Sequence, residues 1–408
     1  MMIWPTTTFG SLYEEPSRNG IYKSKEFHGT GTRMVNMGEL FAFPFISNQE
    51  MKRLTLTDVE LDKFQLQKGD LLFARRSLIE SGAGKCVLVE THDEPMVFES
   101  SIIRVRLQQK QCDPRFYYYY FLSPVGRGRI RAIVTGAAQK GIRGSELQNI
   151  EVHSPKIEIQ ERIADILSAY DDLIDNNNQR IALLEEAIHR LYREWFVHLR
   201  FPGHEHTAVV AGVPVGWEKR PLSDLVSTQY GYTESAQDEP VGPKYLRGTD
   251  INKTSYIDWS TVPYCPIDDD VLPKFKLDKY DILMIRMADP GKVGIVEKEI
   301  EAVFASYLVR LKPTSDELTP YYLFYFLSSH EYQGFITGAS TGATRKSASA
   351  TLMTSVNIMV PSHTIQQSFA DYVVPMRQQI TNLLNQNEKL REARDALLPR
   401  LMNGSLPV

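Results

Sequence analysis

The sequence predicts an α+β fold built as a tandem pseudo-twofold repeat, in which an antiparallel two-helix coiled coil separates two mixed α/β domains. Three observations predict it: a strand-like stretch that occurs twice, further matches in the same order, and a long helical pattern that ends each half. The stretch "KFQLQKGDLLFARR" begins at Lys63, and "KFKLDKYDILMIRM" begins at Lys274, an offset of 211 residues. Internal repeats of this kind determine the architecture before any single element does.

The further matches keep their order along the chain. Gly20 corresponds to Gly231 and Arg75 to Arg286 at the same offset of 211, which later falls to 206, as expected when loops differ in length. The later matches are "VFESSIIR" (97–104) with "VFASYLVR" (303–310), "DPRFYYYYFLS" (113–123) with "TPYYLFYFLS" (319–328), and "IQERIAD" (159–165) with "IQQSFAD" (365–371). Chance similarity between strands does not produce such a series, so we predict two copies of one unit.

Each predicted unit begins with a strand-rich domain and ends in a long helix. Short β-branched and aromatic runs alternate with Gly, Pro and Asp turns, and the hydrophobic period then changes from two to about 3.6. The expected boundaries are 1–155 for the first domain, 156–200 for the first helix, 201–361 for the second domain with a linker at 201–216, and 362–408 for the second helix.

The two helices carry matching hydrophobic seams with a spacing of three and four residues, which is typical of coiled coils. The first seam is Ile163, Leu167, Tyr170, Ile174, Asn177, Ile181, Leu184, Ile188, Leu191 and Trp195. The second is Phe369, Val373, Met376, Ile380, Leu383, Asn387, Leu390, Arg394, Leu397 and Leu401. Pro375 lies inside the second seam and removes a helix hydrogen bond, so we expect a kink there or a helix that starts late.

The two polar seam residues predict the register of the pair. An antiparallel alignment that brings Asn177 opposite Asn387 gives every seam position a partner, with Trp195 opposite Phe369 and Tyr170 opposite Arg394. A buried Asn pair selects one register because a slip leaves an amide unpaired among apolar side chains. The alternative is that each helix packs separately on its own domain.

Composition and cysteine usage argue against secreted, membrane-spanning, disulfide-rich and metal-binding classes of protein. The chain has 408 residues, 42% of them hydrophobic, and a net charge of −4. We find neither a secretory signal pattern nor an apolar run long enough to span a bilayer. Cys86, Cys112 and Cys265 lie far apart, which predicts a reducing cytoplasm with no disulfide frame and no metal site, and "HEH" (204–206) is too weak a pattern to suggest a metal.

Local charge indicates where nucleic acid would bind. Residues 104–143 hold nine basic residues and one acid, whereas 158–194 hold nine acids and four bases. A basic lobe beside an acidic helix suits phosphate contact on the lobe and protein contact on the helix. The alternative is that these charges only form a solvated surface.

Single residues within this pattern are candidates for DNA contact. Arg75 and Arg286 end matched strands, where an arginine reads guanine or forms a structural ion pair, and the sequence leaves both possibilities open. Glycines flank a loop with a basic centre, which lets its backbone approach a phosphate. The predicted DNA-binding residues are Arg75, Arg76, Lys85, Arg127, Arg129, Gln139, Lys140, Arg143, Tyr230, Tyr232, Arg286, Lys292, Arg345 and Lys346. The aromatic runs at 116–122 and 321–327 are expected to be buried helices rather than base-stacking surfaces.

One stretch carries a family resemblance. "GAAQKGIRGSELQNIEVHSPKIEIQERIADIL" (136–167) resembles a hallmark of the specificity subunits of Type I restriction-modification enzymes: a G-x-x-Q-x-x-I loop, a short strand, a proline, E-x-Q and a long helix. "VPVGWEKRPLSDLV" (213–226) is also similar to that family. The second copy departs from the pattern, with "GASTGATRKSASATL" (338–352) in place of the loop and "HTIQQ" (363–367) without the acidic residue.

The resemblance implies a non-catalytic DNA-recognition subunit. Its two domains would be target-recognition domains, each of which reads one half of a split DNA site, while the helices set the spacing. Two methyltransferase subunits would bind the chain, restriction/translocase subunits would join through the complex, and S-adenosylmethionine, ATP and Mg would belong to those partners. Because the loops of the two halves differ, the full site should be asymmetric.

Other functions remain as alternatives. The chain has no G-x-x-x-x-G-K-[ST] phosphate loop and no [ND]-P-P-[YF] methyltransferase motif, which argues against a self-contained enzyme. A stand-alone DNA-binding regulator or defence-system adaptor on the same scaffold is the second reading.

Overall fold

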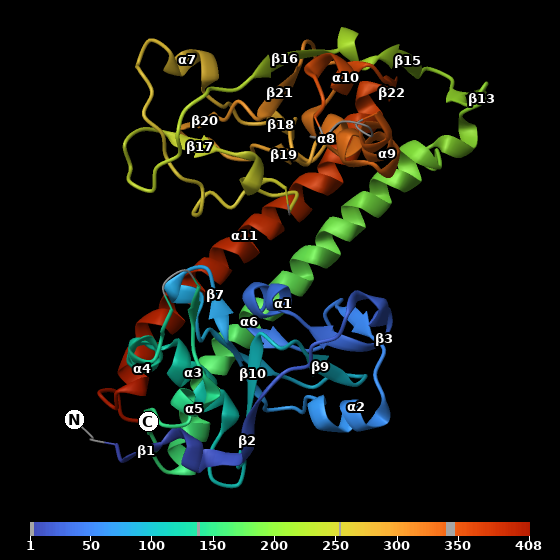
Figure 1. Cartoon of the computed structure of the whole chain (residues 1–408). Helices are drawn as coiled ribbons and strands as arrows, with labels where there is room; N and C mark the ends of the chain where they lie inside the picture. The colour runs from blue at the N-terminus through green and yellow to red at the C-terminus, as the bar shows by residue number, and fades with distance from the viewer. Residues whose placement is uncertain (1–3, 137–138, 253, 340–346) are drawn as a thin grey trace. The chain divides into compact units, whose positions relative to one another are not determined.

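The computed structural model describes residues 4–136, 139–252, 254–339 and 347–408, and the chain divides into two compact units (Figure 1). Unit 1 comprises Met1–Asn176 with Gln386–Val408, and unit 2 comprises Asn177–Asn385. The division falls inside both long helices, α6 (Ile157–Tyr192) and α11 (His363–Met402). Each unit therefore consists of one α/β domain and one part of each helix.

Unit 1 is built on a five-stranded sheet with the order β2-β10-β6-β8-β4 and a three-stranded sheet with the order β5-β3-β9. Its strands are β1 (Thr6–Thr8), β2 (Tyr13–Asn19), β3 (His28–Val35), β4 (Phe45–Ile46), β5 (Lys52–Leu54), β6 (Leu71–Ala74), β7 (Arg76–Ser77), β8 (Cys86–Val89), β9 (Met96–Phe98), β10 (Ile102–Leu107), β11 (Lys140–Gly141) and β12 (Glu151–His153). Its shorter helices are α1 (Met37–Ala42), α2 (Asp58–Phe64), α3 (Pro114–Leu122), α4 (Pro124–Ala132) and α5 (Gly144–Leu147).

Unit 2 repeats this plan around a four-stranded sheet with the order β16-β21-β18-β19. Its strands are β13 (Val209–Val210), β14 (Val213–Pro214), β15 (Glu218–Pro221), β16 (Val226–Tyr230), β17 (Lys244–Leu246), β18 (Ile282–Ile285), β19 (Val293–Ile295), β20 (Ala302–Phe304), β21 (Leu308–Pro313) and β22 (Asn357–Val360). Its shorter helices are α7 (Leu272–Phe275), α8 (Pro320–Ser328), α9 (His330–Ala339) and α10 (Ala350–Thr354).

The repeated stretch forms the same turn and buried strand in both units. The turn residues Gly69 and Tyr280 both have positive φ, of 91° and 75°. Asp70 and Asp281 follow them, and each accepts a hydrogen bond from the backbone N–H three residues earlier, at 2.8 and 2.9 Å. The strands that come next, β6 and β18, are buried throughout. Gly69 adopts this conformation freely, whereas Tyr280 adopts it at a steric cost, so the turn geometry is kept in both copies of the repeat.

The matched glycines show why the repeat needs them. A Cβ on Gly20 would lie 2.2 Å from the carbonyl oxygen of Phe98, and one on Gly231 would lie 2.3 Å from that of Phe304. Neither position therefore accepts a side chain. These contacts accompany parallel pairing in both copies, of β3 with β9 and of β17 with β20. The predicted tandem α/β repeat is confirmed.

The aromatic runs form the core helices α3 and α8, as expected. Asp113 caps α3 by accepting from the N–H groups of Arg115 and Phe116 at 2.7 and 3.0 Å, and Pro114 occupies the first turn. Residues 116–121 of α3 are all buried, and so are residues 321–325 of α8. These rings pack within the units and do not form a base-stacking surface.

The long helices pair antiparallel within each unit. In unit 1, Ile163 and Leu167 of α6 share a hydrophobic cluster with Leu398 and Leu401 of α11. In unit 2, the rings of Trp195 and Phe369 lie 6.1 Å apart, as the predicted register requires. The pairing agrees with the coiled-coil prediction rather than with two separately packed helices.

One detail of the helix prediction needs correction, and one of the two outcomes expected for Pro375 is excluded. The guanidinium group of Arg394 forms ion pairs with Asp171 and Asp395 instead of lying on Tyr170, because a carboxylate one residue further along α6 satisfies it better than a ring. Because α11 begins at His363 and continues through Pro375, the second helix does not start late, and a kink at Pro375 stays a prediction. Asn177 and Asn387 are both buried, at 6% and 0% exposure, but they belong to different units and their pairing stays a prediction.

Candidate nucleic-acid interface

A short β-ribbon in unit 1 brings several predicted residues together. Strand β7 pairs with β11 so that Arg76 lies opposite Gly141, and the N–H of Ile142 donates to the carbonyl of Arg75 at 3.0 Å. The ribbon therefore places Lys140 and its neighbours Gln139 and Arg143 beside the end of β6. Gln139, Arg76 and Arg143 are exposed, and Lys140 is half-buried.

The glycines of the ribbon are required by its geometry. Gly136 has φ +104°, and a Cβ there would lie 2.1 Å from the carbonyl oxygen of Gln139. A Cβ on Gly141 would lie 2.8 Å from the carbonyl oxygen of Arg75. The two glycines that flank this loop therefore allow close backbone approaches that a side chain would block.

Unit 2 contains the same backbone arrangement. Met287 forms a β-bridge with Ser347, and the N–H of Ala348 donates to the carbonyl of Arg286 at 2.8 Å. These residues occupy the positions of Arg76, Gly141, Ile142 and Arg75 in unit 1. The predicted Arg345 and Lys346 directly precede Ser347 and lie outside the described residues.

The two strand-end arginines have few partners. Arg75 is half-buried and donates from Nη1 to the carbonyl of Ser100 at 3.3 Å. Arg286 lies over the ring of Tyr230 at 4.6 Å, and its buried Nε has no hydrogen-bond partner among the described residues. In the described part of the chain, neither arginine forms an ion pair with an acid. This argues against the structural ion-pair alternative.

Two predicted cations support a loop instead of pointing into solvent. Arg127 donates to the carbonyls of Ser81, Ala83 and Gly84 at 2.8, 3.3 and 3.1 Å. Lys85 donates to the carbonyl of Phe41 at 2.7 Å. Burial lowers the pKa of both groups. We therefore interpret them as supports of the loop between β7 and β8, a role that depends on which carbonyls the fold brings near and is invisible in the sequence.

The remaining predicted residues are divided between surface and core. Arg129 is exposed, with Nη2 3.7 Å from a Glu151 oxygen, and Lys292 is exposed directly before β19, the strand that pairs with β18. Tyr230 is 43% exposed, whereas the ring of Tyr232 packs on Phe275 with centroids 5.3 Å apart. Tyr232 therefore stabilises its loop.

A cavity in unit 2 borders the strand-end arginine and was missed from the sequence. It measures about 960 Å³ and is lined by residues that include Arg247, Asn252, Met287, Ala288 and Tyr307. Ala288 has φ +69°, and the buried Oδ1 of Asn252 has no partner among the described residues. A strained residue and an unpaired acceptor are typical of functional sites. The sequence signals neither, because both depend on backbone conformation.

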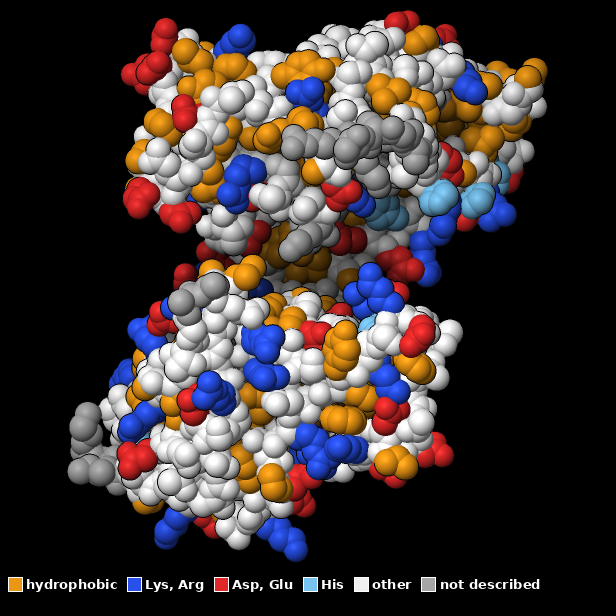
Figure 2. Space-filling view, viewed as in Figure 1, with side chains coloured by type: hydrophobic (Ala, Val, Ile, Leu, Met, Phe, Trp, Pro, Cys, Tyr) orange, Lys and Arg blue, Asp and Glu red, His pale blue; other side chains and the backbone are white. Residues whose placement is uncertain are grey.

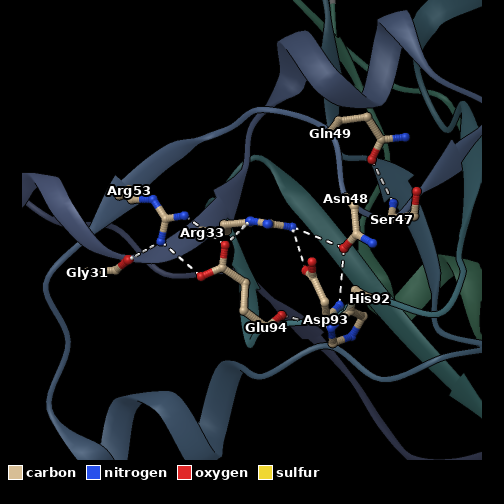
Figure 3. Close-up of polar contacts among 9 residues, drawn as sticks. All are labelled: Gly31, Arg33, Ser47, Asn48, Gln49, Arg53, His92, Asp93 and Glu94. Atoms are coloured by element: carbon tan, nitrogen blue, oxygen red, sulfur yellow. Dashed lines mark hydrogen bonds and ion pairs between the residues drawn. The ribbon is translucent and has the colours of Figure 1, made fainter.

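Unit 1 holds a second cationic feature at β3 and β5 (Figure 3). Arg53 donates two hydrogen bonds to Glu94, at 2.7 and 3.0 Å, and Arg33 binds the same carboxylate. Arg33 also donates to Asn48 at 3.2 Å. The open groove beside this network is lined by residues that include Lys25, His28, Arg33, Lys52 and Arg53. These arginines lie outside the basic stretch at 104–143, so sequence charge counting missed them.

Figure 2 shows Lys and Arg side chains on the visible face of unit 1, interspersed with acids. Among the described residues, no group of three His, Cys, Asp or Glu side chains could hold a metal ion. In the same residues, no helix has the length and apolar character needed to cross a membrane. All three cysteines are buried free thiols, and burial raises the pKa of Cys265 to about 11.

The fold and the site define a class of protein with two homologous α/β domains, each with a segment bridged to a strand end, and two long helices that contribute to both units. The model of the Type I restriction modification DNA specificity domain matches residues 10–186 and 214–392. The chain belongs to this family.

Curated relatives and a solved structure agree with this family. The MjaIX specificity subunit of Methanocaldococcus jannaschii is 26% identical over 312 residues, which cover 72% of this chain and 69% of that protein. The EcoBI specificity subunit of Escherichia coli is 22% identical over 339 residues, 77% of this chain and 70% of the relative. The crystal structure of the S subunit of a type I system from M. genitalium has the same fold, with a TM-score of 0.55 at 18% identity over 98% of this chain and 96% of that one.

The chain is thus a DNA specificity subunit of a type I restriction-modification system, a recognition subunit without a catalytic role. DNA is the partner that the family description gives for such a chain. The two units also carry paired glutamines at matched positions. Gln160 and Gln366 each accept a hydrogen bond from the N-cap residue of an aromatic helix, and each donates to the proline that precedes a long helix.

Proposed function

We propose that each unit reads one half of a bipartite, asymmetric DNA site. The observation that supports this most directly is the shared backbone arrangement of strand end and loop, which carries different side chains in the two copies. Arg76 and Gln139 in unit 1 correspond to Met287 and Arg345 in unit 2, whereas Lys140 and Lys346 are both lysine. Two copies of one scaffold with unlike contact residues favour two unlike half-sites.

Within each unit, the strand-end arginines are the candidates for base contact. A guanidinium group can bind O6 and N7 of guanine with two hydrogen bonds, and Arg75 and Arg286 are not held by acids among the described residues. The exposed Arg76, Lys140 and Arg143 suit phosphate oxygens, which set orientation and supply salt-dependent affinity.

The helices act as a spacer and as a docking surface. Their antiparallel pairing, with Asn177 opposite Asn387, would set the distance between the half-sites. Because the repeat presents two similar helical faces, two methyltransferase subunits would bind per chain, and restriction/translocase subunits would join through them. S-adenosylmethionine, ATP and Mg would be used by these partners, and the assembly would act in the cytoplasm, where host DNA lies.

A domain exchange combined with methylome sequencing tests the proposal. Residues 1–155 are replaced by the corresponding domain of another family member, and the methylated sites of a host with the complete system are read. We expect one half-site to change while the other half and the gap remain. The reciprocal exchange of 217–361 should change the other half. A change in both half-sites from a single exchange would contradict the proposal.

The spacer role has its own test. Deletion of seven residues from each long helix, at matched seam positions, should shorten the gap between the half-sites and keep their sequences. A gap that stays constant in an active complex would show that the helices do not set it.

A further inference from the structure

The loop between β7 and β8 in unit 1 presents two apolar side chains to solvent. Leu78 is 85% exposed and Ile79 is 64% exposed, directly after Ser77 of the β-ribbon. Each side chain therefore forgoes most of the free energy that its burial would contribute. Two adjacent exposed apolar residues beside a cationic ribbon suggest that the pair binds a partner.

The loop that carries them is tightly held. Its carbonyls at 81, 83 and 84 accept from Arg127, and the N–H of Ile79 donates to the Ser77 hydroxyl at 3.2 Å. The short 3-10 turn at Glu80–Gly82 packs against Phe41, because a Cβ on Gly82 would lie 3.2 Å from that ring. The two apolar side chains are therefore presented by a fixed backbone, which lowers the entropy lost on binding.

The loop between β7 and β8 is longer than the corresponding loop of unit 2. The N–H of Gly84 donates to the carbonyl of Ala74 at 2.8 Å, and in unit 2 the N–H of Gly291 donates to that of Ile285 at 2.9 Å. These matching bonds enclose nine residues in unit 1 (75–83) and five in unit 2 (286–290). The extra residues include Leu78 and Ile79, so any contact they make is specific to one half-site.

The surroundings of the pair favour DNA as the occupant. Arg76 precedes it and Lys140 lies opposite Ser77 on the ribbon. The neighbouring acid, Glu80, lies 3.5 Å from Arg131, which offsets its charge. Apolar side chains that cationic groups place against a duplex contact thymine methyl groups or insert between bases.

We propose that Leu78 and Ile79 make an apolar contact with the bases of the half-site that unit 1 reads, and this inference rests on the proposed function. The contact would add sequence discrimination without phosphate neutralisation. It would release no counterions, so it would contribute nothing to the salt dependence of binding.

The test uses the complex of this chain with its methyltransferase subunits and a labelled duplex that carries the methylated site. We expect L78S/I79S to weaken specific binding about tenfold or more, with an unchanged slope of log affinity against log salt. Duplexes with dU in place of each dT probe methyl contact, and duplexes with 2-aminopurine probe unstacking. One of these probes should respond with the wild-type complex and lose its response with the variant.

Val59→Ser is the matched control, because Val59 is 76% exposed on α2 of the same unit. It should leave affinity unchanged. Failure of the wild-type complex to distinguish its site from random DNA would count against the proposed function itself. Wild-type specificity with equal L78S/I79S affinity would overturn the present inference alone. The inference would also be overturned if L78S/I79S weakened only the assembly with the methyltransferase subunits. That result would assign Leu78 and Ile79 to a protein interface.

Discussion

Arg377 of α11 binds Glu297 through two hydrogen bonds, from Nε at 2.8 Å and from Nη2 at 2.5 Å, with only 1% of Arg377 exposed. The same guanidinium group donates to the side chain and the carbonyl of Ser255, at 2.9 and 3.1 Å. One buried arginine thus joins the second long helix to two loops of the unit 2 domain. In unit 1, Asp171 of α6 occupies the matched position and binds Arg394 instead.

This ion pair should contribute strongly to the stability of unit 2. Removal of one partner leaves the other charge buried, so Arg377→Met should lower the free energy of unfolding by roughly 3 kcal/mol. Equilibrium unfolding in urea measures this change in the free energy of unfolding. Arg190→Ala breaks an exposed pair with Glu186 on α6 and should cost less than about 0.5 kcal/mol. Equal effects of the two substitutions would show that burial does not strengthen the Arg377 pair.

The paired glutamines should stabilise their own units separately. Gln160→Met removes the hydrogen bonds to the N–H of Asp113 and the carbonyl of Pro155, and should cost roughly 2 kcal/mol. Hydrogen exchange should accelerate at the start of α3 and not at the start of α8. Gln366→Met should give the reverse pattern, and faster exchange in both units from either substitution would contradict this assignment.

The exposed cations of the ribbon should determine salt dependence. Arg76→Ala and Lys140→Ala should each weaken DNA binding and lower the slope of log affinity against log salt by about 0.9 per lost phosphate contact. Arg345→Ala and Lys346→Ala should behave in the same way if unit 2 uses its matched loop. Arg127→Ala is different, because it should lower stability through the loop carbonyls. An unchanged slope would remove a residue from the interface.

Engineered cysteines test the predicted register of the helices. In a chain without its three native cysteines, residues 177 and 387 replaced by Cys should form a disulfide under mild oxidation, because the seam alignment brings them opposite each other. Cys at 177 and 383 should not crosslink. Efficient bonding of the second pair would show that the register is wrong.

His189 should make unit 2 less stable in acid. Burial lowers the pKa of His189, Arg377 and Arg193 lower it further, and Glu185 opposes them. The folded residue therefore stays neutral while the unfolded one takes up a proton below about pH 6.5, so stability present above that pH is lost as the pH falls. The melting temperature should drop less between pH 7.5 and 5.5 for His189→Gln than for the wild type. Equal drops would exclude His189 as the cause.

The sequence by itself determined the duplication, the order of elements and the helix seams. Gly20 and Gly231, the Asp70 and Asp281 turns and the aromatic helices all follow from local patterns, because backbone sterics and hydrophobic periodicity act over a few residues. It also placed Arg75 at a strand end, whereas Lys140, expected on a loop, lies in the short strand β11. The spacing of the glycines at 136 and 141 was sufficient to predict a close backbone approach there.

Only the tertiary structure decided how the charged and aromatic side chains are used. Arg127 and Lys85 donate hydrogen bonds to backbone carbonyls, and Tyr232 packs on Phe275, although the sequence predicts all three as DNA-binding surface residues. Arg394 forms an ion pair with Asp171. The rigid exposure of Leu78 and Ile79 also depends on Arg127, which lies 48 residues further along the chain than Ile79. Long side chains select partners among groups that folding brings together from distant segments, and no local pattern encodes that choice.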